Sequence, residues 1–248
     1  MSATPAFGPP GTHVVKICSL RTPADGVAAA EAGADLVGLI FAPARRRVSV
    51  EAAAEIAAAV RSTGPGAPRI VGVFVDESAS RLNEIAARLD LDLIQLHGDE
   101  PPETVAAVAR PAIKALRLRP GIDLDAARSL AERYLSAAVA PVALTIEAHV
   151  ASELGGSGRV ADWELVARLA EDYPVILAGG LSPRNVDAAI ATVRPFGVDV
   201  SSGVESGGTK DHAKIRDFVA AARLAFASAD ERVSLHASSG ETPAVSGR

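Results

Sequence analysis

Two small-residue turns near the C-terminal end of the chain are well suited to binding an anion. Gly179 and Gly180 follow a short apolar run at 175–178, and Ser202 and Gly203 follow a second run at 198–200. Glycine has no Cβ, so the backbone can approach a ligand closely and take positive φ values. Free N–H groups in such turns, next to a helix N-terminus, favour a dianion. We therefore predict that these four residues bind phosphate, although such glycines also serve simply to make tight turns.

Two other residues at the ends of apolar runs have acid–base chemistry. Cys18 follows the run at 14–17 and lies near Lys16 and Arg21, and Glu147 follows the run at 142–146. A free cysteine is usually a small buried hydrophobe, but beside cations it can act as a thiolate base. A lone glutamate is usually a solvated surface charge, but burial can keep it protonated and make it a general acid.

The elements that must position these residues follow a repeating order. Short apolar runs alternate with helical patterns, and no run pairs with the next through a two-residue turn, which excludes a sheet of hairpins. Strict alternation indicates a parallel sheet covered by helices, and eight units close into a single-domain α/β (β/α)₈ TIM barrel. The predicted strands are residues 14–18, 36–41, 70–75, 91–96, 113–116, 142–146, 175–178 and 198–200.

The length and the ends of the chain fit one such barrel. The chain has 248 residues, close to the roughly 250 of a typical (β/α)₈ domain. We predict a barrel over 13–227, with the last helix at 211–227. The lead at 1–12 and the tail at 228–248 are rich in polar residues, glycine or proline, and we predict that both are disordered.

Composition narrows the classes of partner. The net charge of −5 and the 4% aromatic content argue against a nucleic-acid surface. A single cysteine excludes an intramolecular disulfide and disfavours a zinc cluster, so we expect no metal. No signal-like N-terminus and no apolar run of about 18 residues are present, so we expect a cytoplasmic protein without a membrane partner.

Six motifs in register resemble those of the phosphoribosylanthranilate isomerase family. Together they extend from about Val14 to Phe226. The motifs are K-I-C at 16–18, V-G-V-F-V-D at 71–76, Q-L-H-G-D-E at 95–100, G-G-S-G…D-W at 155–163, A-G-G-L-S-P-R-N-V at 178–186 and S-S-G-V-E…K-D at 201–211. The resemblance implies a (β/α)₈ enzyme of tryptophan biosynthesis that performs an Amadori rearrangement on a small phosphorylated substrate. It implies no cofactor, and it leaves monomer and homodimer open.

The resemblance also implies roles for individual residues. Glu147 would protonate the ribose ring oxygen, and the Cys18 thiolate would remove the C2′ proton. The family's phosphate site maps onto the two small-residue turns, and Asp199 would contact the substrate. The arginine that meets the anthranilate carboxylate falls in the run at 45–47, and the spacing to Val48 selects Arg46. A guanidinium suits a carboxylate because it can donate two parallel hydrogen bonds.

The sequence departs from the family pattern at four positions. Ser19 and Arg21 replace a glycine and a threonine of the family's K-I-C-G-L-T, Ala44 replaces a serine, and Glu147 replaces the usual aspartate. The longer acid leaves open a related phosphorylated amino-sugar substrate. A barrel that binds a phosphorylated ligand without catalysis is a further alternative.

Two other enzyme classes fit less well. A histidine-pathway or dual-substrate sugar isomerase would carry an aspartate after the first strand, where this chain has Cys18. A metal-dependent pentose-phosphate epimerase would need several ligands at strand ends, and His97 alone does not make such a site.

Overall fold

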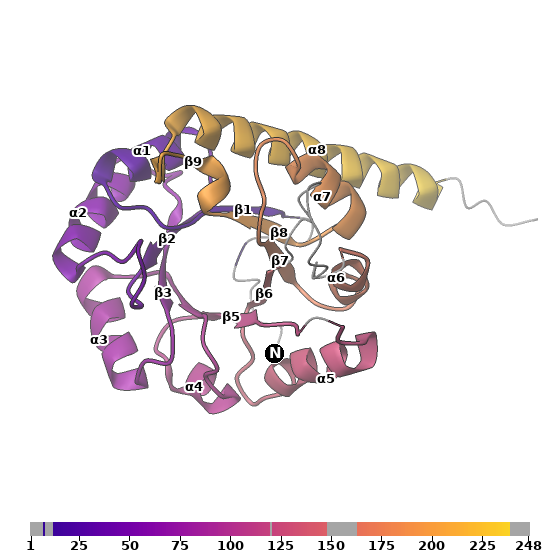
Figure 1. Cartoon of the computed structure of the whole chain (residues 1–248), viewed down its shortest axis with the longest axis horizontal. Coiled ribbons are helices and arrows are strands. Elements are labelled where there is room, and N and C mark those ends of the chain that lie inside the picture. Colours follow the sequence, from indigo (N-terminus) through magenta and orange to yellow (C-terminus); the bar gives the residue numbers. More distant parts are fainter. Residues whose placement is uncertain (1–6, 8–11, 120, 148–162, 239–248) are drawn as a thin grey trace, which may run out of the picture.

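The chain forms a closed barrel of eight parallel strands surrounded by helices (Figure 1). The computed structural model describes residue 7 and residues 12–119, 121–147 and 163–238, with side chains up to residue 231. The strands are β1 (Val14–Ile17), β2 (Leu36–Ile40), β3 (Arg69–Phe74), β4 (Leu93–Leu96), β5 (Ala112–Leu116), β6 (Ala143–Glu147), β7 (Val175–Ala178) and β8 (Gly197–Val200). Strand β8 pairs with β1 and closes the ring, so the predicted single-domain (β/α)₈ barrel is confirmed.

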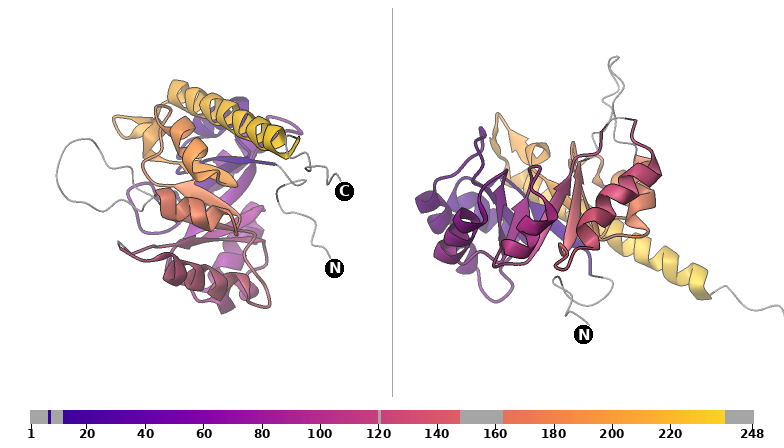
Figure 2. Two further views of the ribbon diagram at one scale, coloured as in Figure 1. Left: turned by 90° about the vertical axis from the view of Figure 1, so that its right-hand side faces the viewer. Right: turned by 90° about the horizontal axis from the view of Figure 1, so that it is seen from below.

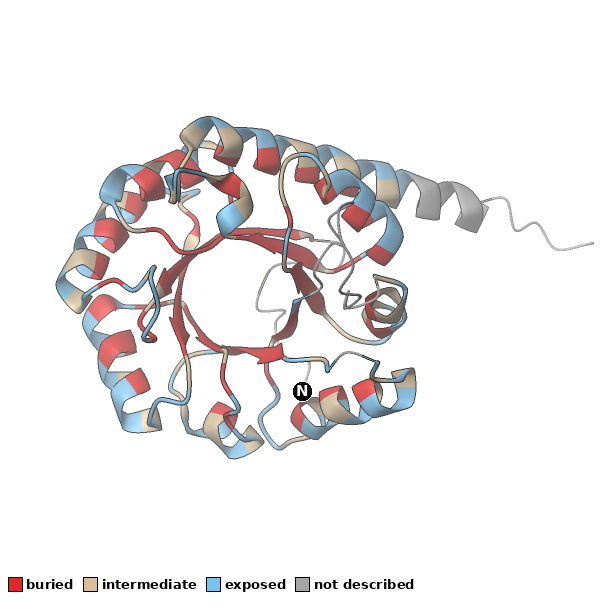
Figure 3. Cartoon of the chain, in the orientation of Figure 1, coloured by how far each residue is buried: buried red, intermediate tan, exposed pale blue. Residues whose placement is uncertain are grey.

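A helix follows every strand of the barrel. The helices are α1 (Pro23–Glu31), α2 (Val50–Arg61), α3 (Ala79–Leu89), α4 (Pro102–Ala107), α5 (Leu124–Leu135), α6 (Trp163–Ala170), α7 (Val186–Val193) and α8 (His212–Ser238). Several begin at side chains that accept a hydrogen bond from the first turn: Thr22 before α1, Ser49 before α2 and Asp123 before α5. Figure 3 shows their buried sides facing the strands and their exposed sides facing outward.

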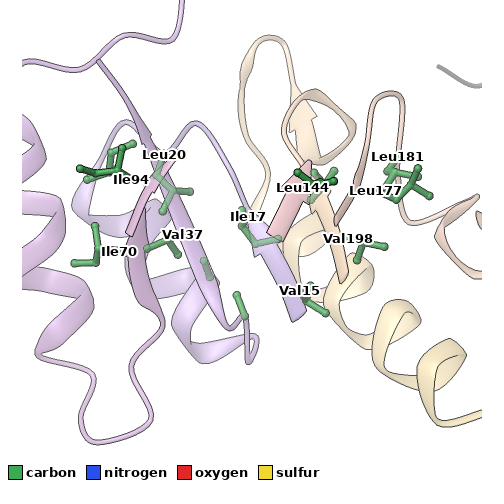
Figure 4. Packing of buried hydrophobic residues seen from close by; sticks show 14 of the residues in the cluster. Val15, Ile17, Leu20, Val37, Ile70, Ile94, Leu144, Leu177, Leu181 and Val198 are labelled. Atoms are coloured by element: carbon green, nitrogen blue, oxygen red, sulfur yellow. The ribbon is translucent and has the colours of Figure 1, made fainter. Parts of the chain in front are cut away.

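The parallel register sorts the strand residues into two sets, because successive side chains in a strand point to opposite faces. One set faces the helices and forms the larger apolar core, part of which is drawn in Figure 4. The other set points into the barrel. Its lowest layer is an apolar cluster with one residue from each of seven strands: Val14, Leu36, Val71, Leu93, Ile113, Ala143 and Ile176.

The next layer inside the barrel is partly polar. On β1, β4 and β6 stand Lys16, Gln95 and Thr145, each two positions after a residue of this cluster. Asp199 on β8 also belongs to this layer, and all four residues are buried. On β2, Gly38 stands two positions after Leu36. Because the apolar layer and the polar layer fill the inside of the barrel, a ligand has room only at the C-terminal ends of the strands.

Two elements differ from the prediction. Helix α8 was expected to end at 227 but continues to Ser238 and extends beyond the barrel (Figure 2). No glycine or proline interrupts 212–238, and alanine, leucine, arginine and glutamate favour a helix. Residues 1–6, 8–11 and 239–248, also predicted to be disordered, lie outside the described part of the chain.

The second difference is a small hairpin after β8. Strands β9 (Glu205–Ser206) and β10 (Thr209–Lys210) pair antiparallel across a two-residue turn, and the sequence analysis did not predict these two short strands. The turn is Gly207-Gly208, with φ values of 59° and 82°. Two positive φ values are what a type I′ turn requires, and glycine takes them without steric cost. A short 3₁₀ turn, η1 (Ser202–Val204), leads into the hairpin.

The buried face of α8 gives a prediction about stability. Phe218 is fully buried, whereas Leu224 on the same helix is 72% exposed. We expect Phe218→Ala to lower the free energy of unfolding by about 3–5 kcal/mol, because it leaves a cavity in the core. Leu224→Ala is the matched control and should change it by less than about 0.5 kcal/mol. Urea denaturation of both variants measures the difference; equal effects would show that α8 does not pack as described.

Candidate active site

A cavity of about 370 Å³ opens at the C-terminal ends of the barrel strands. This volume lies within the range of small-molecule sites. Seven of the eight residues selected from the sequence line it: Cys18, Arg46, Glu147, Gly179, Gly180, Asp199 and Ser202. The eighth, Gly203, packs directly behind the wall, where a Cβ would lie 1.8 Å from the carbonyl oxygen of Leu181. Ser19, Gln95 and His97 also line the cavity.

Cys18 follows β1, and the residue is 7% exposed. Its amide donates to the carbonyl of Val200 at 2.8 Å, which fixes the backbone against β8. The sulfur lies over Gly38 of β2, where a Cβ would stand only 2.7 Å from Sγ. The absence of a side chain at Gly38 therefore makes room for the thiol.

Lys16 lies beside the thiol in the floor of the cavity. Its Nζ donates to Oδ2 of Asp199 at 2.5 Å, and both side chains are buried. Burial opposes the charge of Lys16, but the Asp199 carboxylate and Cys18 outweigh burial, so the pKa of Lys16 is raised. Arg46 and Lys210 also interact electrostatically with Cys18. Three basic side chains thus interact with one sulfur.

Arg46 is held by a carboxylate from the β9–β10 hairpin. Its Nε donates to Oε1 of Glu205 at 2.6 Å and its Nη2 to Oε2 at 2.9 Å. The hydrogen bond from Arg46 is the largest cause that lowers the pKa of Glu205, to about 2, against an ordinary value of 4.5. Its neighbours in the arginine run lie differently. The Arg45 side chain is 61% exposed, and Arg47 lines a separate cavity beside α2 and α3.

Three buried oxygen atoms in the polar layer have no hydrogen-bond partner among the described residues. They are Oδ1 of Asp199, Oε1 of Gln95 and Oγ1 of Thr145. Asp199 and Gln95 line the cavity. Buried polar atoms are almost always hydrogen-bonded in native proteins. The floor therefore suits a ligand that carries hydroxyl groups.

Glu147 ends β6 at the opposite side of the cavity, with its side chain 48% exposed. Nε2 of His97 lies 3.3 Å from Oε1 of Glu147, and Nδ1 of His97 lies 2.9 Å from the side-chain nitrogen Nε2 of Gln95. The loop after Glu147, which includes 155–162 of the G-G-S-G…D-W motif, lies outside the described residues.

The two small-residue turns lie against each other. Gly179 and Gly180 have φ values of 90° and 66°, and the close approach of Gly203 to Leu181 brings the second turn onto the first. Among the described residues, the amides of Gly180, Ser202 and Gly203 donate to no partner. Unused N–H groups around one cavity wall suit an anion. Within the described chain, no group of three or more histidine, cysteine or acidic side chains is placed to hold a metal ion.

Sequence reasoning gave no role to Lys16 beyond its proximity to Cys18, and none to Glu205 or Lys210. All three lie inside the quoted motifs K-I-C and S-S-G-V-E…K-D, so their presence in those motifs was the available signal. Lys16 and Glu205 have partners in distant parts of the chain, which depend on the folded register, whereas Lys210 contacts the nearby Ser201 and Glu205.

The comparisons agree with this geometry. A model of the family described as N-(5′-phosphoribosyl)anthranilate (PRA) isomerase matches residues 15–221. The chain belongs to the PRA isomerase family. The N-(5′-phosphoribosyl)anthranilate isomerase of Roseiflexus sp. (strain RS-1) is 50% identical over 216 residues, which cover 85% of this chain and 98% of the relative.

Solved structures of the same family have the same fold. The phosphoribosyl anthranilate isomerase from Thermotoga maritima superposes with a TM-score of 0.71 at 35% identity, over 86% of this chain and 100% of that chain. A structure of such an enzyme in complex with reduced 1-(o-carboxyphenylamino)-1-deoxyribulose 5-phosphate gives a TM-score of 0.70 at 33% identity, with the same coverage.

The Arg46–Glu205 pair predicts a pH dependence of stability. Because the pKa of Glu205 is lowered to about 2, its stabilising contribution is present above its ordinary value of 4.5 and is lost as the pH falls toward 2. We expect the unfolding free energy of wild type to exceed that of Glu205→Gln by about 3 kcal/mol near neutral pH. Near pH 3 this difference should be smaller by about 2 kcal/mol.

Denaturant unfolding at about pH 6 and about pH 3 measures this difference. Glu55→Gln, which changes an exposed glutamate without an ion pair among the described residues, is the control and should show no such narrowing. If the difference in unfolding free energy between wild type and Glu205→Gln is the same at both pH values, the ion pair is contradicted.

Proposed function

We propose that this chain isomerises N-(5′-phosphoribosyl)anthranilate to 1-(2-carboxyphenylamino)-1-deoxyribulose 5-phosphate, a step of tryptophan biosynthesis. The observation that carries the proposal is one cavity lined by Cys18, Arg46, Glu147 and the two small-residue turns, in a member of the PRA isomerase family. The relatives' shared isomerase name supports this activity over a diverged substrate or a non-catalytic barrel.

The reaction requires an acid and a base on different sides of the sugar. Glu147 donates a proton to the ribose ring oxygen, the bond from that oxygen to C1′ breaks, and an iminium ion forms. The thiolate of Cys18 then takes the proton from C2′, giving the enol. The proton on sulfur passes to C1′ and the enol hydroxyl proton returns to Glu147, so the ketone forms and both groups regain their starting states.

The remaining residues bind and orient the substrate. Lys16, Arg46 and Lys210 interact electrostatically with the sulfur of Cys18. The amides of Gly179, Gly180, Ser202 and Gly203 bind the phosphate, and Arg46 binds the anthranilate carboxylate. Oδ1 of Asp199, which lacks a partner in the cavity floor, accepts a hydrogen bond from a sugar hydroxyl.

We place the enzyme in the cytoplasm as a monomer or homodimer, with this small phosphorylated substrate and with no nucleic-acid or membrane partner. One solved relative from Thermotoga maritima is described as dimeric, with monomers generated from it. Among the described residues, no helix has the length and apolar character needed to cross a membrane.

Complementation tests the function directly. The gene is expressed in a bacterial tryptophan auxotroph that lacks this isomerase, and growth on minimal medium is scored. Growth supports the proposal. Failure to grow, with the protein present and folded, would reject it, and the purified protein would then be offered other phosphorylated amino sugars.

The acid and the base give a prediction about turnover. Cys18→Ser and Glu147→Gln should each lower kcat by roughly 100-fold to 10,000-fold, because each removes a proton-transfer group, while leaving the melting temperature nearly unchanged. Glu147→Asp keeps the carboxyl and should retain activity. Steady-state kinetics with thermal melts measure these effects. Normal turnover in either of the first two variants would remove that residue from the mechanism.

The contact between Gly38 and the thiol gives a second prediction. Gly38→Ala places a Cβ at 2.7 Å from Sγ of Cys18, so the sulfur must shift. We expect kcat to fall on the order of 100-fold, since a displacement of about 1 Å can have that effect. Gly66→Ala, at a glycine with nothing within 4 Å of the new methyl group, is the control and should be active. Equal activity of the two variants would show that the sulfur position is not limiting.

A further inference from the structure

Glu205 is fixed in place by the chain around it. Its backbone carbonyl accepts from Nζ of Lys214 at 2.9 Å, and Nζ of Lys210 lies 3.5 Å from its Oε1. Lys210 also donates to the carbonyl of Ser201 at 2.7 Å, which ties the hairpin to the end of β8. On the other side, Nη2 of Arg21 donates to the carbonyl of Gly208 at 2.8 Å. The hairpin is therefore anchored to the segments that follow β1 and β8.

The contact with Arg46 uses only one edge of the guanidinium. A guanidinium has five N–H donors in a planar fork, so it can offer a carboxylate the edge formed by Nε and one Nη, or the end formed by the two Nη groups. Glu205 occupies the first, through Nε and Nη2. Among the described residues Nη1 donates to no partner, and Arg46 lines the cavity. The end of the fork thus remains available to a ligand.

We propose that Glu205 is a positioning residue that holds Arg46 by its side edge and presents the other end of the guanidinium to the carboxylate of the substrate. The inference rests on the proposed function, because it names the group that the carboxylate-binding arginine needs in order to be oriented. It makes the β9–β10 hairpin a determinant of specificity for substrates with an ortho carboxylate on the aromatic amine.

The pair also accounts for the charge at this wall. Arg46 alone would place an uncompensated cation beside Cys18 and Lys210. With Glu205 ionised, the pair is neutral overall but still offers a directed donor. An arginine fixed in advance loses less side-chain entropy when the ligand binds, and this lowers the cost of binding.

The test compares Glu205→Gln with wild type in steady-state kinetics on N-(5′-phosphoribosyl)anthranilate. We expect KM to rise roughly tenfold with a much smaller change in kcat, because a charge-assisted bidentate contact is replaced by a weaker neutral one. Glu205→Asp, which shortens the side chain and keeps its charge, is a second variant and should give a smaller rise. Arg45→Ala, which removes only the longer 3.5 Å contact to Glu205, is the matched control and should keep the wild-type KM.

Two further measurements separate positioning from a general structural role. In an Arg46→Ala background, Glu205→Gln should add little to KM, since the residue through which it acts is gone. With N-(5′-phosphoribosyl)aniline, which lacks the carboxylate, Glu205→Gln and wild type should have the same KM. A full effect of Glu205→Gln in the Arg46→Ala background, an equal effect on the aniline substrate, or an unchanged KM for the anthranilate substrate would each overturn the inference.

The kinetics of wild type and of Arg46→Ala tell whether only the inference about Glu205 fails or the proposed function fails as well. If wild type does not convert the anthranilate substrate, the function itself is wrong. If wild type is active and Arg46→Ala raises KM while Glu205→Gln does not, only the role of Glu205 falls.

Discussion

The buried ion pair between Lys16 and Asp199 is the interaction on which the site depends. The two residues are register partners on β1 and β8, the strands that close the barrel. Burying either charge alone would be strongly unfavourable, so each requires the other in its place. Closure with any other register would separate them. The pair thus links the fold to the chemistry, because it sets a cation next to Cys18 and leaves Oδ1 of Asp199, a residue that lines the ligand cavity, without a partner among the described residues.

The fold was predictable because its signals are local. Each strand is a short apolar run, and the observed strands begin and end within two residues of the predicted bounds. The parts that could not be predicted are of two kinds. The extension of α8 has weak local signals, since its last turns have no helix breaker but also no marked apolar stripe. The Gly207-Gly208 hairpin also forms within a short stretch of sequence. Its strands are only two residues long, which is too short for the run of about four to eight residues from which a strand is predicted.

The charge network of the site was beyond reach for a different reason. Arg46 and Glu205 are 159 residues apart in the sequence, and Lys16 and Asp199 are 183 apart. The motifs contain Lys16 and Glu205, and the family resemblance assigns Arg46 and Asp199 to the substrate, but neither tells which side chain meets which. Such pairing depends on register and on loop conformation, which emerge only when the barrel closes.

Two departures from the family pattern have a physical account. Ser19 takes a φ of 67°, a conformation that glycine adopts most easily, and its hydroxyl lies 2.7 Å from that of Ser201. That hydrogen bond offsets part of the backbone strain where the family usually has glycine. Arg21, in place of threonine, reaches the carbonyl of Gly208 and helps to fix the hairpin that carries Glu205. Nothing in the structure explains Ala44.

The most direct measurement is a crystal structure of this protein with reduced 1-(o-carboxyphenylamino)-1-deoxyribulose 5-phosphate, the compound bound in a solved relative. We expect its phosphate to lie on the amides of the two small-residue turns and its carboxylate to lie on Arg46. The sulfur of Cys18 and the carboxyl group of Glu147 should then lie on opposite sides of the sugar chain. A phosphate bound elsewhere, or a sulfur that does not face the carbon equivalent to C2′, would contradict the account.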